Sequence, residues 1–198
     1  MKKLLALVLA LVMTLSLCVV SSNAAFSDDA DIDHQEAVEV MNALNIINGM
    51  GDGKFDPDGT LTRAMLVTIL YRAEGSPNVS GEANPFTDVK SGQWYTDAVI
   101  WAAHEGIVNG MTETTFAPNL KITREQIATI LYRYAGSPKT DGSLDEFSDA
   151  LTVSPYAIDA MTWAVEEGII NGMDGKLAPK DNATRAQIAT LLMRYLEK

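Results

Sequence analysis

Apolar residues recur at helical spacing along the chain and predict six helices that come in three pairs. In the middle pair, Ala98, Trp101 and Ala102 fall on one face of the first helix. The first helices of the pairs are predicted over residues 33–44, 94–105 and 156–167. Each ends before a residue that tolerates the left-handed backbone conformation past a helix end. These residues are Asn45, Gly106 and Gly168.

The second helix of each pair carries an apolar stripe and starts after a threonine. Leu66, Ile69 and Leu70 form the first of these stripes, and the other two helices repeat it with isoleucine, leucine and tyrosine. Such stripes form core far more often than ligand surface. Trp101 and Trp163 lie in the middle of first helices, so we expect both to be buried in the core as well.

The helix pairs belong to three copies of one unit. Thr-Arg occurs at Thr62, Thr123 and Thr184, 61 residues apart both times, and Asn-Gly-Met precedes each copy. A fixed period of this kind identifies a repeat protein. We therefore predict an all-α fold of three helix-loop-helix repeats. Their bounds are residues 26–75, 84–136 and 145–198. Residues 74–85 and 135–146 are rich in Gly, Ser and Pro and are expected to link the repeats.

The N-terminus, residues 1–25, is predicted to be a secretory signal peptide. Lys2 and Lys3 precede an apolar run that ends in small residues, and the run is short for a membrane span. A retained membrane anchor is the alternative. Cleavage would remove Cys18, the only cysteine, and change the formal charge from −11 to −13. An acidic chain without a basic block is not expected to bind nucleic acid, and no later apolar run is long enough to span a membrane.

Several short motifs recur in the repeats. They include a Phe-x-Asp opening, Trp-Tyr-x-x-Ala-Val at residues 94–99, Gly-Ile-Val-Asn-Gly, Phe-x-Pro and Ile-Thr-Arg-Glu. Together these motifs resemble the S-layer homology (SLH) family over residues 26–198. The resemblance implies a single-chain pseudo-threefold bundle that binds cell-wall polymers non-covalently, typically pyruvylated secondary polysaccharides. Such modules hold S-layer proteins and exoenzymes on bacteria, so we expect a secreted protein located at the cell wall or S-layer surface.

The threonine of each Thr-Arg pair is predicted to cap the second helix, which places an arginine at the first helical position. There the cation faces the positive end of the helix dipole, which disfavours it by up to about 1 kcal/mol. Three repetitions of an unfavourable choice suggest a function, and a guanidinium beside free backbone N–H groups makes an anion site. The alternative is that each arginine pairs with the aspartate of the Phe-x-Asp motif. The residues concerned are Arg63, Arg124, Arg185, Asp28, Asp88 and Asp149.

Trp94 and Tyr156 are candidate sugar-stacking residues, because an aromatic ring suits the apolar face of a sugar. Packing at the start of a helix is their alternative role. The glycines of the Asn-Gly pairs complete the candidate binding set. They are Gly49, Gly110 and Gly172.

Two further sets of residues are predicted to be structural. Gln126 and Gln187 stand three residues after a capping threonine and can complete a capping box, whereas Met65 cannot. The second set consists of arginines late in the second helices, where a cation suits the C-terminal end of the dipole. These are Arg72, Arg133 and Arg194.

The first loop carries three aspartates between glycines, which is typical of a calcium site. They are Asp52, Asp56 and Asp58, and they do not recur in the other two copies of the loop. Counted from Asp52, the sixth position is Pro57, where an EF-hand has Gly. Calcium is therefore not expected as a shared requirement, and a site private to the first repeat stays open.

No constellation of catalytic residues accompanies the repeats. His34 and His104 are the only histidines and occupy non-equivalent places, so we predict no enzymatic activity, cofactor or metal. The predicted function is non-covalent anchoring to an acidic, pyruvylated secondary cell-wall polysaccharide or another acidic wall glycan. The alternative is a structural or protein-interaction module of an S-layer or envelope assembly, which would make S-layer or envelope proteins its partners.

Overall fold

The computed structural model describes residues 26–28 and 35–198, and every regular element in them is a helix. This confirms the all-α prediction. The signal peptide prediction, and the start of the first helix at residue 33, lie outside the described residues. The α-helices are α2 (Gln35–Ala43), α3 (Arg63–Ala73), α4 (Thr96–His104), α5 (Arg124–Tyr134), α6 (Ile158–Glu166) and α7 (Arg185–Leu196). Two short 3₁₀ helices, η1 (Ala150–Thr152) and η2 (Pro155–Ala157), precede α6.

The first helices of the second and third repeats begin later than predicted. Helix α4 begins at Thr96 rather than Trp94, because the Thr96 hydroxyl accepts from the Gln93 amide and donates to the Lys90 carbonyl, which fixes a turn before the helix. Helix α6 begins at Ile158, and Tyr156 lies in η2 instead. The three first helices end one residue earlier than predicted, at Ala43, His104 and Glu166, and the predicted left-handed residues lie just past these ends. Their φ values are 56° at Asn45, 69° at Gly106 and 65° at Gly168.

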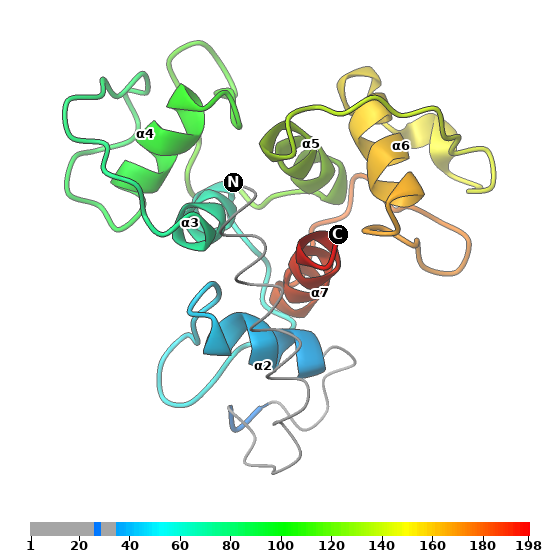
Figure 1. Cartoon of the computed structure of the whole chain (residues 1–198), viewed down its shortest axis with the longest axis horizontal. Helices are drawn as coiled ribbons and strands as arrows, with labels where there is room; N and C mark the ends of the chain where they lie inside the picture. The colour runs from blue at the N-terminus through cyan, green and yellow to red at the C-terminus, as the bar shows by residue number, and fades with distance from the viewer. Residues whose placement is uncertain (1–25, 29–34) are drawn as a thin grey trace. The chain divides into compact units, whose positions relative to one another are not determined.

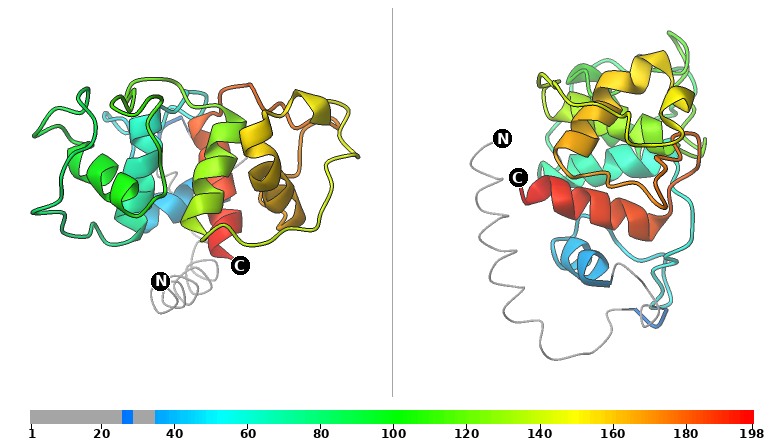
Figure 2. Two further views of the ribbon diagram at one scale, coloured as in Figure 1. Left: turned by 90° about the horizontal axis from the view of Figure 1, so that it is seen from above. Right: turned by 90° about the vertical axis from the view of Figure 1, so that its right-hand side faces the viewer.

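The chain divides into two compact units, one of which contains α2 and α7 and the other α3 to α6. Within the first unit α2 packs on α7. Within the second, α3 packs on α4 and α5 packs on α6, as the two views in Figure 2 also show. Each pair in the second unit joins the last helix of one repeat to the first helix of the next (Figure 1). The packing pairs are therefore out of step with the sequence repeats by one helix.

The apolar stripes of the helices are core, as predicted. Leu66 and Leu70 of α3 are at most 1% exposed, and Ile127 and Leu131 of α5 are equally buried. The two mid-helix tryptophans are buried as well, with Trp101 at 6% and Trp163 at 4% exposure.

A ring of backbone hydrogen bonds joins equivalent residues of the three repeats inside the second unit. The Ile122 amide donates to the Leu61 carbonyl at 3.0 Å, and the Leu61 amide donates to the Ala183 carbonyl at 3.3 Å. The Ala183 amide closes the ring on the Ile122 carbonyl at 3.4 Å. The ring thus links three residues that occupy the same place in the sequence repeat, Leu61, Ile122 and Ala183.

None of the helices in the described residues combines the length and apolar character that crossing a membrane requires.

Candidate functional site

The second helices begin with the threonine caps that the sequence predicts. The Thr62 hydroxyl accepts from the Met65 amide at 3.3 Å. Thr123 and Gln126 form a full capping box, in which the Gln126 side chain also accepts from the Thr123 amide. The same box starts α7, whereas Met65 leaves α3 with half of it. The caps fix the arginine that follows each threonine at the first helical position.

The three arginines are buried, each at 5% exposure, and their guanidinium groups donate to backbone carbonyls of a loop. The acceptors of the Nε donors are Phe116 O at 2.9 Å for Arg63, Leu177 O at 2.8 Å for Arg124 and Phe55 O at 2.7 Å for Arg185. Burial is the largest effect on these groups and lowers the pKa of all three below the ordinary arginine value. The arginines thus support the loops that carry the Asn-Gly motifs, which the sequence did not indicate.

Arg63 is held at two points and against a ring. Its Nη2 donates to the Asn109 carbonyl at 2.9 Å, and its guanidinium carbon lies 4.6 Å from the centre of the Phe116 ring. Among the described residues, its remaining nitrogen, Nη1, has no hydrogen-bond acceptor. A guanidinium fixed on one edge and unoccupied on another can bind an anion without reorganising.

The aspartates of the Phe-x-Asp motif hold the same loops by their amides. The two Asp88 carboxylate oxygens accept from the Phe116 and Ala117 amides at 2.8 and 2.7 Å. Asp28 and Asp149 hold the corresponding amides of their own loops. Among the described residues no ion pair joins these aspartates to the arginines. The alternative of a direct arginine–aspartate pair is therefore not observed, although burial lowers the pKa of Arg63 and the charge of Asp88 offsets a small part of that lowering.

The glycines of the Asn-Gly motifs leave room for the phenylalanine of the Phe-x-Asp motif. A Cβ on Gly110 would lie 2.8 Å from Phe86 Cε1. The same clash would arise at Gly49 with Phe26, at 2.5 Å, and at Gly172, which has a φ of 72°. These contacts give the three glycines a structural reason, and Gly110 also lines the pocket described next.

A pocket of about 340 Å³ lies in the second unit and brings Arg63, Gly110 and Tyr156 together. One face of α5 forms a wall with Gln126, Thr129, Ile130 and Arg133. The loop before α5 supplies the rest of the lining, namely Val108, Asn109, Gly110 and Met111. No carboxylate lines this pocket. After burial, the charge of Arg133 further lowers the pKa of Arg63, because the two cations repel each other and no acidic side chain of the lining compensates their charge.

Arg133 is the pocket residue that the sequence reasoning missed as a ligand group. It does lie in the last turn of α5, where it suits the helix dipole as predicted. The positions 126, 129, 130 and 133 share one helical face, and that spacing was the available signal. The sequence does not show that this face of α5 lies next to Arg63, because that depends on how the repeats pack against each other.

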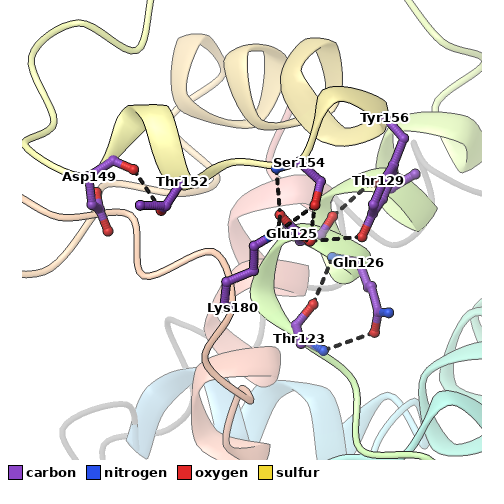
Figure 3. A network of polar contacts seen from close by, with 9 residues as sticks. All are labelled: Thr123, Glu125, Gln126, Thr129, Asp149, Thr152, Ser154, Tyr156 and Lys180. Atoms are coloured by element: carbon purple, nitrogen blue, oxygen red, sulfur yellow. Dashed lines mark hydrogen bonds and ion pairs between the residues drawn. The ribbon is translucent and has the colours of Figure 1, made fainter.

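Tyr156 reaches the pocket from the third repeat and is tied to a buried carboxylate. It is 55% exposed, and its hydroxyl donates to Glu125 Oε1 at 2.9 Å (Figure 3). Partial burial, and then the hydrogen bond and charge of Glu125, raise the pKa of Tyr156 to about 12. Glu125 itself is 4% exposed and pairs with Lys180 at 2.8 Å. Neither Glu125 nor Lys180 was singled out from the sequence.

The other predicted site residues lie outside this pocket. Trp94 is 59% exposed and stands edge-on to Tyr95, with 5.1 Å between the ring centres. Arg124 and Gly172 belong to the same unit without lining the pocket. Arg185 and Gly49 are in the first unit. The structure thus brings three of the predicted residues into one site.

The loop aspartates give no sign of a cation site. In the part of the chain that the structure describes, no three His, Cys, Asp or Glu side chains are grouped so that they could hold a metal ion. Asp52 and Asp56 instead take left-handed φ values of 50° and 58°, which asparagine and aspartate tolerate better than most residues. The equivalents of Asp56 are Ala117 and Ala178, which take the same conformation with φ values of 58° and 49°, so the loop geometry does not depend on the aspartate.

Comparisons with known proteins match most of the chain. A family model for the S-layer homology domain matches residues 25–64, 85–128 and 146–189. The surface-layer 125 kDa protein of Lysinibacillus sphaericus is 37% identical over 82% of this chain and 14% of its own length. An amylopullulanase of Thermoanaerobacterium thermosulfurigenes is 34% identical over 87% of this chain and 10% of its own. The exoglucanase XynX of Acetivibrio thermocellus is 33% identical over 91% of this chain and 17% of its own length. The chain spans less than a fifth of each of these relatives.

Proposed function

Because the chain belongs to the S-layer homology domain family, we propose that it anchors to the bacterial cell wall by binding an acidic wall polysaccharide in the pocket of Arg63 and Arg133. S-layer homology domains are anchoring modules rather than catalytic ones, and the three matched segments run from residue 25 to residue 189. The surface-layer protein and the two polysaccharide-degrading enzymes among its relatives suggest that the module serves cargo of different kinds. We place its action at the bacterial surface.

The observation that carries the proposal is a pair of arginines in one pocket without a carboxylate. Like charges repel, so two cations that share a cavity favour an anion between them. Arg63 is desolvated and fixed by carbonyls, so it is prepared for the ligand before binding. A guanidinium matches a carboxylate in bidentate geometry, and we therefore expect the ligand's acid to be a carboxylate such as a pyruvate substituent.

Tyr156 supplies the apolar part of the site. Its ring lies at the pocket and is half exposed, which suits contact with the less polar face of a sugar. Met111, in the loop before α5, also lines the pocket, is 49% exposed and offers a second apolar contact. An acid-bearing sugar would thus meet both cationic and apolar side chains in this pocket.

The net charge of the chain makes a local site necessary. At −11 overall, the protein repels an acidic polymer at long range. Attraction must therefore come from short-range contacts with desolvated cations. We extend the proposal to Arg124 and Arg185, which start their helices in the same way, and to Trp94, Gly49 and Gly172 at the matching sequence positions. Further weak sites on a repeating polymer would raise the overall affinity by multivalency.

Wall sacculi provide the test. The purified chain should sediment with intact sacculi and stay in solution with sacculi from which the non-peptidoglycan polymer has been stripped. Free polymer should compete, and polymer with its carboxyl groups reduced should not. Equal binding to both kinds of sacculi would overturn the glycan proposal. Binding to neither would favour a protein partner in the surface layer instead.

A further inference from the structure

We infer that Glu125 and Lys180 act as a neutral clamp that positions Tyr156 at the pocket, and that Lys180 screens the Glu125 charge from an acidic ligand. This inference rests on the proposed function, because it assigns the clamp a role in the same pocket. Neither residue lines the pocket, so both are positioning residues rather than ligand contacts.

The carboxylate of Glu125 is fully occupied. Oε1 accepts from the Lys180 ammonium at 2.8 Å, from the Ser154 hydroxyl at 2.9 Å and from the Tyr156 hydroxyl at 2.9 Å. Oε2 accepts from Lys180 at 2.9 Å and from the Ser154 amide at 3.0 Å. Lys180 also contacts the Ser154 hydroxyl. Figure 3 shows these groups converging on the start of α5 from the segment before α6 and from the loop before α7.

The clamp decides how Tyr156 can meet a ligand. Its hydroxyl proton is committed to Glu125, so the ligand meets the ring and the hydroxyl oxygen rather than a free donor. The tether also fixes the ring, which removes an entropy loss on binding. Glu125 is therefore one hydrogen bond away from the pocket, and its charge acts on the same ligand as Arg63.

The fold does not require this clamp. The loop before α7 docks on the start of α5, where the Glu125 amide donates to the Pro179 carbonyl at 3.0 Å. At the start of α3 the equivalent residue is Ala64, whose amide donates to the Pro118 carbonyl at the same distance. The position that matches Lys180 is Asn119 there. The same docking thus forms without a charged pair.

The aromatic residue changes together with the clamp. The second repeat has Trp94 where the third has Tyr156, and tryptophan has no hydroxyl to tether. The carboxylate that accepts from a hydroxyl is present at α5 and absent at α3. This covariation within one chain links Glu125 to Tyr156 rather than to helix formation.

Replacing Lys180 alone should weaken ligand binding more than replacing Glu125 and Lys180 together. Without Lys180, a buried carboxylate loses its counter-charge and faces the anion pocket. With glutamine at both positions, the site is neutral, and the residue 125 side chain can still accept from Tyr156. With the α3 pair, alanine and asparagine, the site is neutral but Tyr156 loses its acceptor.

The experiment compares binding of these variants to intact sacculi. We expect K180Q to bind about tenfold more weakly than the unmodified chain, as one uncompensated charge at about 8 Å would produce at an effective dielectric near 30. E125Q/K180Q should recover to within about twofold, and E125A/K180N should remain about threefold weak, since each factor of ten corresponds to about 1.4 kcal/mol. Thermal unfolding checks that each variant is folded. E125A/K180N carries the two residues that occur naturally at the equivalent positions of α3, Ala64 and Asn119, so we expect it to fold.

Equal weakness of K180Q and E125Q/K180Q would overturn the screening role, and unchanged binding in all variants would overturn the whole inference. If K180Q does not fold, the two neutral variants still test the tether, because they differ in whether residue 125 can accept from Tyr156, and equal binding by the two would overturn it. Fluorine NMR of 3-fluorotyrosine, assigned by its absence in Y156F, tests the tether without any ligand. The residue 156 signal should keep its shift in E125Q/K180Q and move in E125A/K180N. If the unmodified chain ignores intact sacculi, the proposed function fails, while an unmoved fluorine signal refutes the clamp itself.

Discussion

The starts of α3 and α5 are built on one plan and differ in what they present. Both begin with a threonine cap and a buried arginine that donates to a loop carbonyl. The arginine of α3 rests on the Phe116 ring, whereas the loop under Arg124 has Leu177 in that place. The residue after the arginine is Ala64 in α3 and Glu125 in α5. The parts that the two share hold loops, and the parts that differ determine charge and aromatic contacts.

This comparison separates scaffold from ligand chemistry within one chain. The repeated arginine is buried and hydrogen-bonded to backbone carbonyls at both Arg63 and Arg124, so its primary role is structural. Binding then depends on what surrounds its unoccupied edge. At Arg63 the surroundings are Arg133 and Tyr156 in a pocket. The start of the helix thus holds the arginine in place, and residues from neighbouring segments complete the binding site.

The largest expected effect is on stability at the two arginines. Arg63→Ala removes one buried and one partly buried hydrogen bond to loop carbonyls, together with the contact with Phe116. Leaving buried carbonyls unsatisfied and opening a cavity should lower the free energy of unfolding by about 4 kcal/mol. Arg124→Ala removes one such bond and no ring contact, so about 2 kcal/mol is expected. Denaturant titration measures both, and equal losses would show that the ring and the second bond contribute nothing.

Asp149 supports the loop on which Arg124 rests. Burial raises its pKa, but the hydrogen bonds from the Leu177 and Ala178 amides outweigh this and hold the pKa below the ordinary value. Its stabilisation is therefore complete above the unfolded pKa of about 4 and is lost as pH falls through the lower folded value. Asp149→Asn should lower stability by about 2 kcal/mol at pH 7. The deficit should shrink below pH 4 in thermal melts, and a deficit that is constant with pH would contradict this assignment.

Arg133 tests the pocket with little disturbance of the fold. Its side chain has no hydrogen bond or ion pair to another described residue, and Arg133→Gln should keep the unfolding free energy within about 0.5 kcal/mol. Sedimentation with intact sacculi should show binding about tenfold weaker, which is about 1.4 kcal/mol. Lys139→Gln makes the same change of charge on the exposed linker and should leave binding unchanged. Equal losses in the two variants would reduce the effect to net charge.

The smallest effect concerns the capping difference between the two helices. Met65→Gln should complete the capping box of α3 and raise the free energy of unfolding by about 0.5 kcal/mol. Gln126→Met should remove the box from α5 and lower it by a similar amount. Chemical denaturation of the two single variants and the exchanged pair reveals whether the changes cancel. A loss of stability in Met65→Gln would mean that the methionine contributes packing instead.

Local signals in the sequence were sufficient for the existence of the helices, the caps of the second helices and the residues past the ends of the first, but not for the starts of α4 and α6. Thr123 with Gln126, or Gly106 after α4, acts on neighbours a few residues away, and periodicity reveals such contacts. The pairing of helices across repeats was out of reach, because each apolar stripe fits any partner of the same kind. Arg63 docks on a carbonyl 53 residues later, and Lys180 reaches a carboxylate 55 residues earlier. The repetition of the arginines indicated that they are important, but it did not indicate that their side chains would be buried and bonded to loop carbonyls.

The central claim is that the acid of a wall polysaccharide binds between Arg63 and Arg133. A crystal structure of the chain with an acid-bearing fragment of that polysaccharide tests it most directly. We expect the carboxylate within hydrogen-bonding distance of Arg63 Nη1 and the Arg133 guanidinium, with a sugar ring against Tyr156. A fragment bound elsewhere, with this pocket empty, would contradict the account.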